Sequence, residues 1–305
     1  MKRNFLSIAD FNSREIEELI LNAHRLKVEL REGRRKRKDL EGRLFALIFE
    51  KPSLRTRVTF EAAIHQLGGK PIYLAPGDIK LGKRESVRDI AQNLEKWVDG
   101  IVARVFFHEV LEEMTIASIP VINALSDLEH PCQALADYMT IWEKKGTFKV
   151  NLSFIGDGNN VAHSLILLTA LFGGNFTIAC PIGYEPKEKI LKKGEKIASE
   201  TGATIQITHD PKEAVKKADF IYTDVWASMG QEEEAEKRKR IFVPYQVNSE
   251  LLMDAPKDAL VMHCLPAHRG EEITDDVLNG ERSIVLDQAE NRLHTEKALL
   301  LKIYS

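Results

Sequence analysis

Short apolar runs alternate along the chain with stretches in which apolar residues recur at helical spacing. The run at 44–49, LFALIF, has no polar interruption, which is typical of a strand buried on both faces. Similar strands are expected at 71–74, 100–106, 120–125, 151–156, 176–180, 203–208, 220–224, 259–263 and 283–286. Helices are expected at 57–67, 85–98, 110–117, 131–144, 161–172, 186–201, 211–218 and 291–304. Alternating strands and helices predict parallel sheets with helices on both faces.

The alternation restarts close to Val150, after a break near Gly146. Because 305 residues also exceed the usual size of one domain, two α/β lobes are expected. Residues 1–146 would form the first lobe and residues 147–290 the second.

Composition narrows the class of protein. The chain has 43 Lys and Arg against 46 Asp and Glu, so a protein built mainly to hold nucleic acid is not expected. The apolar segment at 165–172 is too short for a membrane span, and residues 1–19 lack the apolar core of a signal peptide. Cys132, Cys180 and Cys264 are scattered, which favours a reducing cytoplasm over a disulfide framework or zinc ribbon.

Two charged segments are expected at the surface. The basic run at 34–38 is interpreted as a solvated loop, because the rest of the chain is not basic. In the segment 231–240, acidic residues stand four positions before basic ones, a spacing that supports an exposed helix through weak ion pairs.

The first candidate site follows the strand at 44–49, where the sequence reads EKPSLRTR before a helix begins. A strand-to-helix turn presents unpaired N–H groups and the positive end of the helix dipole. Ser53 and Thr56 add hydroxyls, and Arg55 and Arg57 add guanidinium groups. This cluster favours a phosphate-binding site over a simple helix cap.

Further polar residues follow other strands of the first lobe. Arg104 ends the strand at 100–106, and His130 opens the sequence H-P-C-Q at the start of a helix. Open α/β sheets bind ligands at the carboxyl ends of their strands, so these residues could converge on the same crevice. His130 and Gln133 are about one helical turn apart, so both can contact the same small ligand.

The second lobe carries its own candidates. The strand at 151–156 runs into D-G-N-N, where Asn160 could donate to a carboxylate or cap the next helix. The position suits a dinucleotide loop, but the G-x-G-x-x-G pattern is absent. Asp224 follows another strand and offers a carboxylate for an ammonium group. Cys264 follows the strand at 259–263. A thiol at this position either packs in the core or takes part in the reaction.

Together these motifs resemble the aspartate/ornithine carbamoyltransferase family over essentially the whole chain. The resemblance rests on S-L-R-T-R at 53–57, Arg104, H-P-C-Q at 130–133, D-G-N-N at 157–160, D-V-W-A-S-M-G at 224–230, H-C-L-P at 263–266 and E-N-R at 290–292. It implies an active site in the cleft between two lobes, and a terminal helix, 291–305, that returns to the first lobe. It also implies cytoplasmic carbamoyl transfer from carbamoyl phosphate to the δ-amine of ornithine, with no cofactor and no metal. Arginine biosynthesis is the expected direction, although the sequence alone leaves synthesis and breakdown open.

The resemblance also implies roles for individual residues. Arg104, His130 and Cys264 would be catalytic. The carbamoyl-phosphate site would comprise Ser53, Leu54, Arg55, Thr56, Lys80, Arg104, His130, Pro131, Cys132, Gln133, Cys264, Leu265 and Arg292. Ornithine would meet Asn160, Asp224, Ser228 and Met229.

Two positions depart from the family's usual pattern. Leu54 stands where Thr is usual, with a small expected effect because that position contributes its backbone N–H. Lys80 stands where Gln or His is common, in a loop that in the family reaches a neighbouring subunit's site; a lysine still pairs with phosphate as a point charge. The family resemblance therefore implies a homotrimer or an assembly of trimers.

Several alternatives remain at this stage. An aspartate carbamoyltransferase would need basic residues in the second lobe, whereas Asp224 and the S-M-G sequence favour a cationic amino acid. A putrescine carbamoyltransferase would leave Asn160 without a substrate carboxylate, and such enzymes lack S-M-G. A nicotinamide-dependent dehydrogenase would need the missing glycine pattern, and a non-catalytic binding protein would not need Cys264 and Asp224 at strand ends. The acceptor of the amine proton stays open among Cys264, Asp224 and the departing phosphate.

Overall fold

The computed structural model describes residues 3–34, 37–227 and 234–304. Packing divides the chain into two units, Met1–Met139 with Glu290–Ser305, and Thr140–Ala289. The first unit therefore combines two segments that are far apart in the sequence. No described helix combines the length and the apolar character that crossing a membrane requires.

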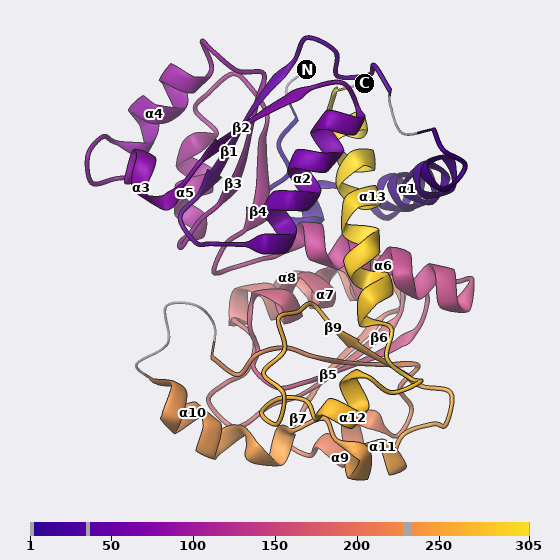
Figure 1. Cartoon of the computed structure of the whole chain (residues 1–305). Helices are drawn as coiled ribbons and strands as arrows, with labels where there is room; N and C mark the ends of the chain where they lie inside the picture. Colours follow the sequence, from indigo (N-terminus) through magenta and orange to yellow (C-terminus); the bar gives the residue numbers. More distant parts are fainter. Residues whose placement is uncertain (1–2, 35–36, 228–233, 305) are drawn as a thin grey trace. The chain divides into compact units, whose positions relative to one another are not determined.

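The first unit contains a four-stranded parallel sheet in the order β2-β1-β3-β4 (Figure 1). Its central strand β1 is buried along nearly its whole length, as the uninterrupted LFALIF run predicts. The strands are β1 (Leu44–Phe49), β2 (Lys70–Leu74), β3 (Gly100–Arg104) and β4 (Val121–Leu125).

Helices cover both faces of this sheet (Figure 1). On one face, α4 (Val87–Leu94) and α5 (His108–Met114) bury apolar residues against Ile48 and Ile101. On the other face, the Tyr304 ring of α13 packs edge-on against Phe45, with 5.1 Å between ring centroids. The remaining helices of this unit are α1 (Ser13–Arg31), α2 (Leu54–Gln66), α3 (Pro76–Ile79), the start of α6 (Pro131–Lys145) and most of α13 (Val285–Tyr304), with a 3-10 turn at Ile8–Asp10.

The second unit contains a five-stranded parallel sheet in the order β7-β6-β5-β8-β9. Its strands are β5 (Asn151–Ile155), β6 (Asn175–Ala179), β7 (Thr204–Thr208), β8 (Phe220–Thr223) and β9 (Leu260–His263). One face is covered by α9 (Pro211–Val215), α10 (Ala235–Phe242), α11 (Ser249–Met253) and α12 (Asp275–Leu278). The other face of the sheet is covered by α7 (Asn160–Leu171) and α8 (Glu188–Thr201) (Figure 1).

The close packing of α8 depends on Gly194. A Cβ atom there would lie 2.8 Å from Ile166 of α7 and 2.8 Å from Ile205 of β7, nearer than side chains approach in packed cores. The absence of a side chain therefore lets α8 settle against both elements. The alternating pattern of the sequence thus folds into the expected class, α/β with two parallel sheets.

Several expected boundaries are corrected by the structure. The strand expected at 283–286 is wrong: Ser283 forms only an isolated bridge to Val261, and helical bonding begins when the N–H of Gln288 donates to Ile284. The terminal helix consequently begins at Val285 rather than at 291. The helix expected from 57 begins at Leu54, because Ser53 caps it. The exposed helix expected within 231–240 begins at Ala235.

Candidate functional site

The turn from β1 into α2 places the first group of candidate residues. Ser53 caps α2, since its Oγ accepts a hydrogen bond of 3.3 Å from the N–H of Thr56. Thr56 is buried, whereas the side chain of Leu54 is 74% exposed. Leu54 therefore contributes its backbone to this turn and leaves its side chain in solvent, so the departure from threonine leaves the turn intact.

Arg57 does not join this group. Its Nε donates to Glu61 at 2.9 Å, and its guanidinium lies 3.5 Å from the centroid of the Tyr73 ring. The sequence predicted Arg55 and Arg57 together as anion donors, but the side chain of Arg57 is committed to its own helix and to β2.

His130 is buried in the first unit, within electrostatic reach of three arginines. Burial, together with the nearby Arg292, Arg104 and Arg55, holds the pKa of His130 well below its ordinary value. Its imidazole is therefore neutral at pH 7 and can donate one hydrogen bond and accept another. The three guanidiniums come from α13, β3 and α2, so residues far apart in the sequence act on the same imidazole.

Arg292 links two other predicted residues. Its Nη1 donates to Gln133 Oε1 at 2.8 Å, and its Nη2 donates to Thr56 Oγ1 at 3.3 Å. The opposite edge of the guanidinium pairs with Glu296, whose Oε1 accepts from Nε at 3.1 Å and from Nη2 at 2.6 Å. Gln133 also donates to Asp137 Oδ1 at 2.8 Å. Glu296 and Asp137 belong to this cluster, although the sequence analysis did not select them.

The remaining predicted residues of the first unit lie nearby in sequence or at the surface. Pro131 is the first residue of α6, and the buried Cys132 donates through Sγ to Asn123 O at 3.3 Å. Burial raises the pKa of the Cys132 thiol, so this cysteine is protonated and packs as a core residue. Lys80 is exposed after α3, with φ of 50°.

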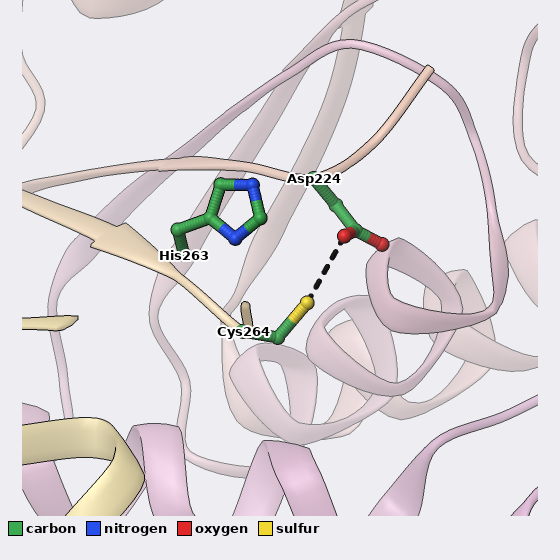
Figure 2. Close-up of side chains that lie close together, drawn as sticks. All are labelled: Asp224, His263 and Cys264. Atoms are coloured by element: carbon green, nitrogen blue, oxygen red, sulfur yellow. Dashed lines mark hydrogen bonds between the residues drawn. The ribbon is translucent and has the colours of Figure 1, made fainter. Parts of the chain in front are cut away.

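The second unit brings Asp224 and Cys264 together at the ends of β8 and β9. Cys264 Sγ donates to Asp224 Oδ1 at 3.0 Å, as Figure 2 shows. Asn159 Nδ2 donates to the other carboxylate oxygen, Oδ2, at 2.8 Å. Both oxygens of Asp224 therefore have a partner, and the carboxylate is held in one orientation.

The helix cap in this loop is Asn159 rather than Asn160. Asn159 Oδ1 accepts from the N–H groups of Val161 and Ala162 at 3.0 and 3.1 Å, and Asn160 is the first residue of α7. One amide side chain thus caps α7 and also orients Asp224. The expected contact of Asn160 with ornithine stays a prediction.

Comparison with known proteins then places the chain. Two family models match it in succession: Aspartate/ornithine carbamoyltransferase, carbamoyl-P binding domain, over residues 3–143, and Aspartate/ornithine carbamoyltransferase, Asp/Orn binding domain, over residues 149–303. The chain belongs to the aspartate/ornithine carbamoyltransferase family.

Relatives within this family match over nearly their whole length. The ornithine carbamoyltransferase of Thermococcus kodakarensis is 52% identical over 300 residues, which are 98% of this chain and 95% of the relative. The solved ornithine carbamoyltransferase from Pyrococcus furiosus has a TM-score of 0.95 at 52% identity, covering 98% and 96% of the two chains. An anabolic ornithine carbamoyltransferase from Campylobacter jejuni has a TM-score of 0.93 at 38% identity, covering 99% of each chain.

In this carbamoyltransferase, the segment after Cys264 is anchored by a buried imidazole–carboxylate pair. His263 Nδ1 accepts from the N–H of Leu265 at 2.8 Å, and the other ring nitrogen, Nε2, lies 3.0 Å from Glu272 Oε1. The N–H of His268 also donates to Glu272 Oε1 at 2.6 Å. These bonds hold Leu265 in a left-handed backbone conformation with φ of 58°.

The hydrogen bonds of His263 also affect whether a metal could bind near Cys264. Ligand atoms of Asp224, His263 and Cys264 lie within 4.8 Å of one another (Figure 2). However, Nδ1 of His263 already accepts from a backbone N–H and Nε2 contacts Glu272. A metal at this cluster would have to displace one of these bonds.

A second buried ion pair of the carbamoyltransferase was not found by sequence reasoning. Arg238 Nη1 donates to Trp226 O at 2.8 Å and lies 3.0 Å from Asp157 Oδ2. Burial raises the pKa of Asp157 to about 6, while Arg238 acts in the opposite direction. Because Arg238 stands in an unbroken run of basic residues, 237–240, nothing in the sequence distinguishes it from its neighbours. Ser228 and Met229 lie outside the described residues.

Proposed function

We propose that this chain transfers the carbamoyl group of carbamoyl phosphate to the δ-amine of L-ornithine, giving L-citrulline and phosphate. The observation that carries the proposal is the buried set of Thr56, Gln133 and Arg292, joined by hydrogen bonds of 3.3 and 2.8 Å, together with the buried His130, whose pKa is lowered by burial and by three guanidiniums. Three guanidinium groups and one neutral imidazole suit a doubly charged phosphate joined to a polar carbonyl group.

The residues that bind carbamoyl phosphate, the donor of the carbamoyl group, are assigned first. The phosphate meets Ser53, the N–H of Leu54, Arg55 and Thr56 at the start of α2, where N–H groups point outward. Arg104 and His130 face the carbonyl oxygen, on which negative charge grows as the amine attacks. Preorganised donors at such a position stabilise the transition state without reorganisation.

The acceptor is identified by the chemistry at the ends of β8 and β9. The oriented carboxylate of Asp224 suits an ammonium group, and no arginine or lysine forms a described contact with it. An aspartate substrate would bring a second carboxylate to this position and would be repelled. Asn160, Ser228 and Met229 are assigned to the rest of ornithine, and Cys264 and Leu265 to the reacting amine.

The proton balance assigns a role to the Cys264–Asp224 pair. The δ-ammonium group loses two protons in forming citrulline. One passes to the Asp224 carboxylate, with Cys264 holding that carboxylate in place, and then to solvent. The second leaves with the departing phosphate as the C–N bond forms and the C–O bond to phosphate breaks. Every step uses groups of the chain and of the two substrates.

One assay tests the proposal. Purified protein is given carbamoyl phosphate with ornithine, putrescine, N-acetylornithine or aspartate, and the carbamoylated products are measured. Citrulline formation with ornithine is expected to exceed product formation with the other three amines. Robust activity with aspartate alone would refute the assignment of the acceptor.

The biosynthetic direction and the assembly are also proposals. The names of the relatives from Pyrococcus furiosus and Campylobacter jejuni include the word anabolic, which supports synthesis of citrulline as the direction in the cell. A homotrimer in which Lys80 reaches a neighbouring subunit's phosphate is expected by family resemblance. Light scattering would give the subunit number, and mixing inactive Arg104→Ala and Lys80→Ala subunits should restore part of the activity if Lys80 acts across subunits.

A further inference from the structure

Glu296 is a fully buried carboxylate one helical turn after Arg292 on α13. Its Oε1 accepts from both Nε and Nη2 of Arg292, at 3.1 and 2.6 Å. Hydrogen bonds between an ionised donor and a carboxylate are among the strongest in proteins. One edge of the guanidinium is therefore fixed by Glu296.

Fixing this edge determines where the rest of the guanidinium points. The group is planar and rigid, with five N–H donors in one plane. After the two bonds to Glu296, Nη2 also donates to Thr56 Oγ1 at 3.3 Å, and Nη1 donates to Gln133 Oε1 at 2.8 Å. One N–H of Nη1 takes part in none of these bonds.

The orientation of the Gln133 amide follows from its two neighbours. Arg292 can only donate, so it faces the carbonyl oxygen of Gln133, while Asp137 Oδ1 accepts from Nε2 at 2.8 Å. A reversed amide would place an NH₂ group against the guanidinium and an oxygen against the carboxylate. The fixed Oε1 has a second lone pair, which can accept a hydrogen bond from an NH₂ group.

We propose that Glu296 is a positioning residue for carbamoyl recognition: by fixing Arg292, it directs the Gln133 carbonyl oxygen toward the NH₂ group of carbamoyl phosphate. The inference rests on the proposed function and adds to it the residue that sets the direction of this contact. Glu296 itself touches neither substrate. Its effect is larger on the carbamoyl half of the donor than on the phosphate half, where Thr56 is the one assigned residue that has a described bond to Arg292.

The proposal predicts different effects of Glu296 variants on two measurable constants. Glu296→Ala removes the acceptor and should raise the KM for carbamoyl phosphate about 10- to 100-fold, the effect of losing a hydrogen bond to a charged group. The inhibition constant of inorganic phosphate, which has no NH₂ group, should change less than about threefold. Glu296→Gln keeps an acceptor oxygen at the same distance and should retain a near wild-type KM.

Glu296→Asp provides a second variant should the alanine variant not fold. It keeps the negative charge but withdraws the oxygen by one methylene, and the KM for carbamoyl phosphate should rise. Ile303→Ala on the same helix is the matched control, because it removes buried apolar contacts without touching the cluster. Its KM should equal that of the wild type even if its melting temperature falls.

The outcomes distinguish this inference from the proposed function. Wild-type protein that forms no citrulline would refute the function. An active wild type whose KM for carbamoyl phosphate is unchanged in both Glu296→Ala and Glu296→Asp would overturn the inference alone. Equal losses of carbamoyl phosphate and inorganic phosphate binding in those variants would also overturn it, because Glu296 would then support the whole pocket without selecting the carbamoyl group.

Discussion

Cys264 donates its thiol hydrogen to the carboxylate of Asp224 across 3.0 Å. The two residues are 40 positions apart, but β8 and β9 are parallel neighbours in which Thr223 faces His263. The next residue on each strand is therefore also side by side. The strand register brings a thiol and a carboxylate together at one edge of the sheet.

Replacing Cys264 tests whether this bond serves the reaction. In Cys264→Ala the Asp224 carboxylate loses the partner of Oδ1, so kcat/KM for ornithine should fall about 10- to 100-fold. The pH dependence of kcat should also change between pH 6 and 9. Cys180→Ala, a buried cysteine outside the cluster, is the control. Full activity of Cys264→Ala across this pH range would refute the role of the pair.

Asn159 has two separable functions. Asn159→Ser keeps a capping oxygen but loses the amide donor to Asp224, whereas Asn159→Ala loses both. Both variants should raise the KM for ornithine, and only the alanine variant should lose about 1 kcal/mol of unfolding free energy. Urea unfolding and steady-state kinetics would measure the two effects. An unchanged ornithine KM in both variants would show that Asp224 is held without Asn159.

The pair of Arg238 and Asp157 makes stability depend on pH. In Arg238→Met the Asp157 carboxylate stays buried without its cation, so unfolding free energy should fall by about 3–5 kcal/mol at pH 8. Burial already raises the pKa of Asp157 to about 6, and without Arg238 it should rise further. The loss should therefore shrink toward pH 5, where Asp157 is neutral. Adding Asp157→Asn should recover most of the loss, and a deficit independent of pH would contradict this account.

Arg14→Met is the matched control for that experiment. Arg14 likewise pairs with a carboxylate, that of Glu18, at 3.2 Å, but the two side chains are 86% and 56% exposed. Exposed pairs contribute little, so the unfolding free energy of Arg14→Met should match the wild type at both pH values.

The buried Glu296 should make the free energy of unfolding fall as pH rises. Burial raises its pKa from 4.5 to about 7, against the effects of Arg292 and Thr59, and Cys132 also lies close enough to interact. The folded state then binds this proton more tightly than the unfolded state, so stability present below pH 4.5 is lost as pH rises through about 7. Glu296→Gln has no such proton, and its unfolding free energy relative to the wild type should increase from pH 5 to pH 8. A constant difference would contradict the raised pKa.

The sequence predicted much of the fold because parallel strands have a strong signature. Uninterrupted apolar runs identified the strands, and the rule that ligands bind at strand carboxyl ends selected Arg104, Asp224 and Cys264. These positions depend on backbone topology, which apolar patterning encodes directly. The structure accordingly brings Cys264 beside Asp224, and places Arg104 near enough to lower the pKa of His130.

The parts that could not be predicted depend on side-chain direction. Asn159 and Asn160 are identical neighbours, and only the start of α7 decides which of them caps it. Arg238 and Glu296 lie on helices among other charged residues, so their burial follows from how each helix packs. The run at 283–286 is apolar enough for a strand, but helical hydrogen bonds from Ile284 onward prevail.

The composition of the first unit from two distant segments has a consequence for how the protein is made. Gln133 and Arg292 are partners separated by 159 positions, and the whole contiguous unit Thr140–Ala289 is synthesised between them. During translation the second unit can fold before the first is complete. A ribosome that stalls before α13 therefore leaves a nascent chain in which the turn after β1 is present but the Gln133–Arg292 bond is missing, so we expect an unfinished chain to be inactive.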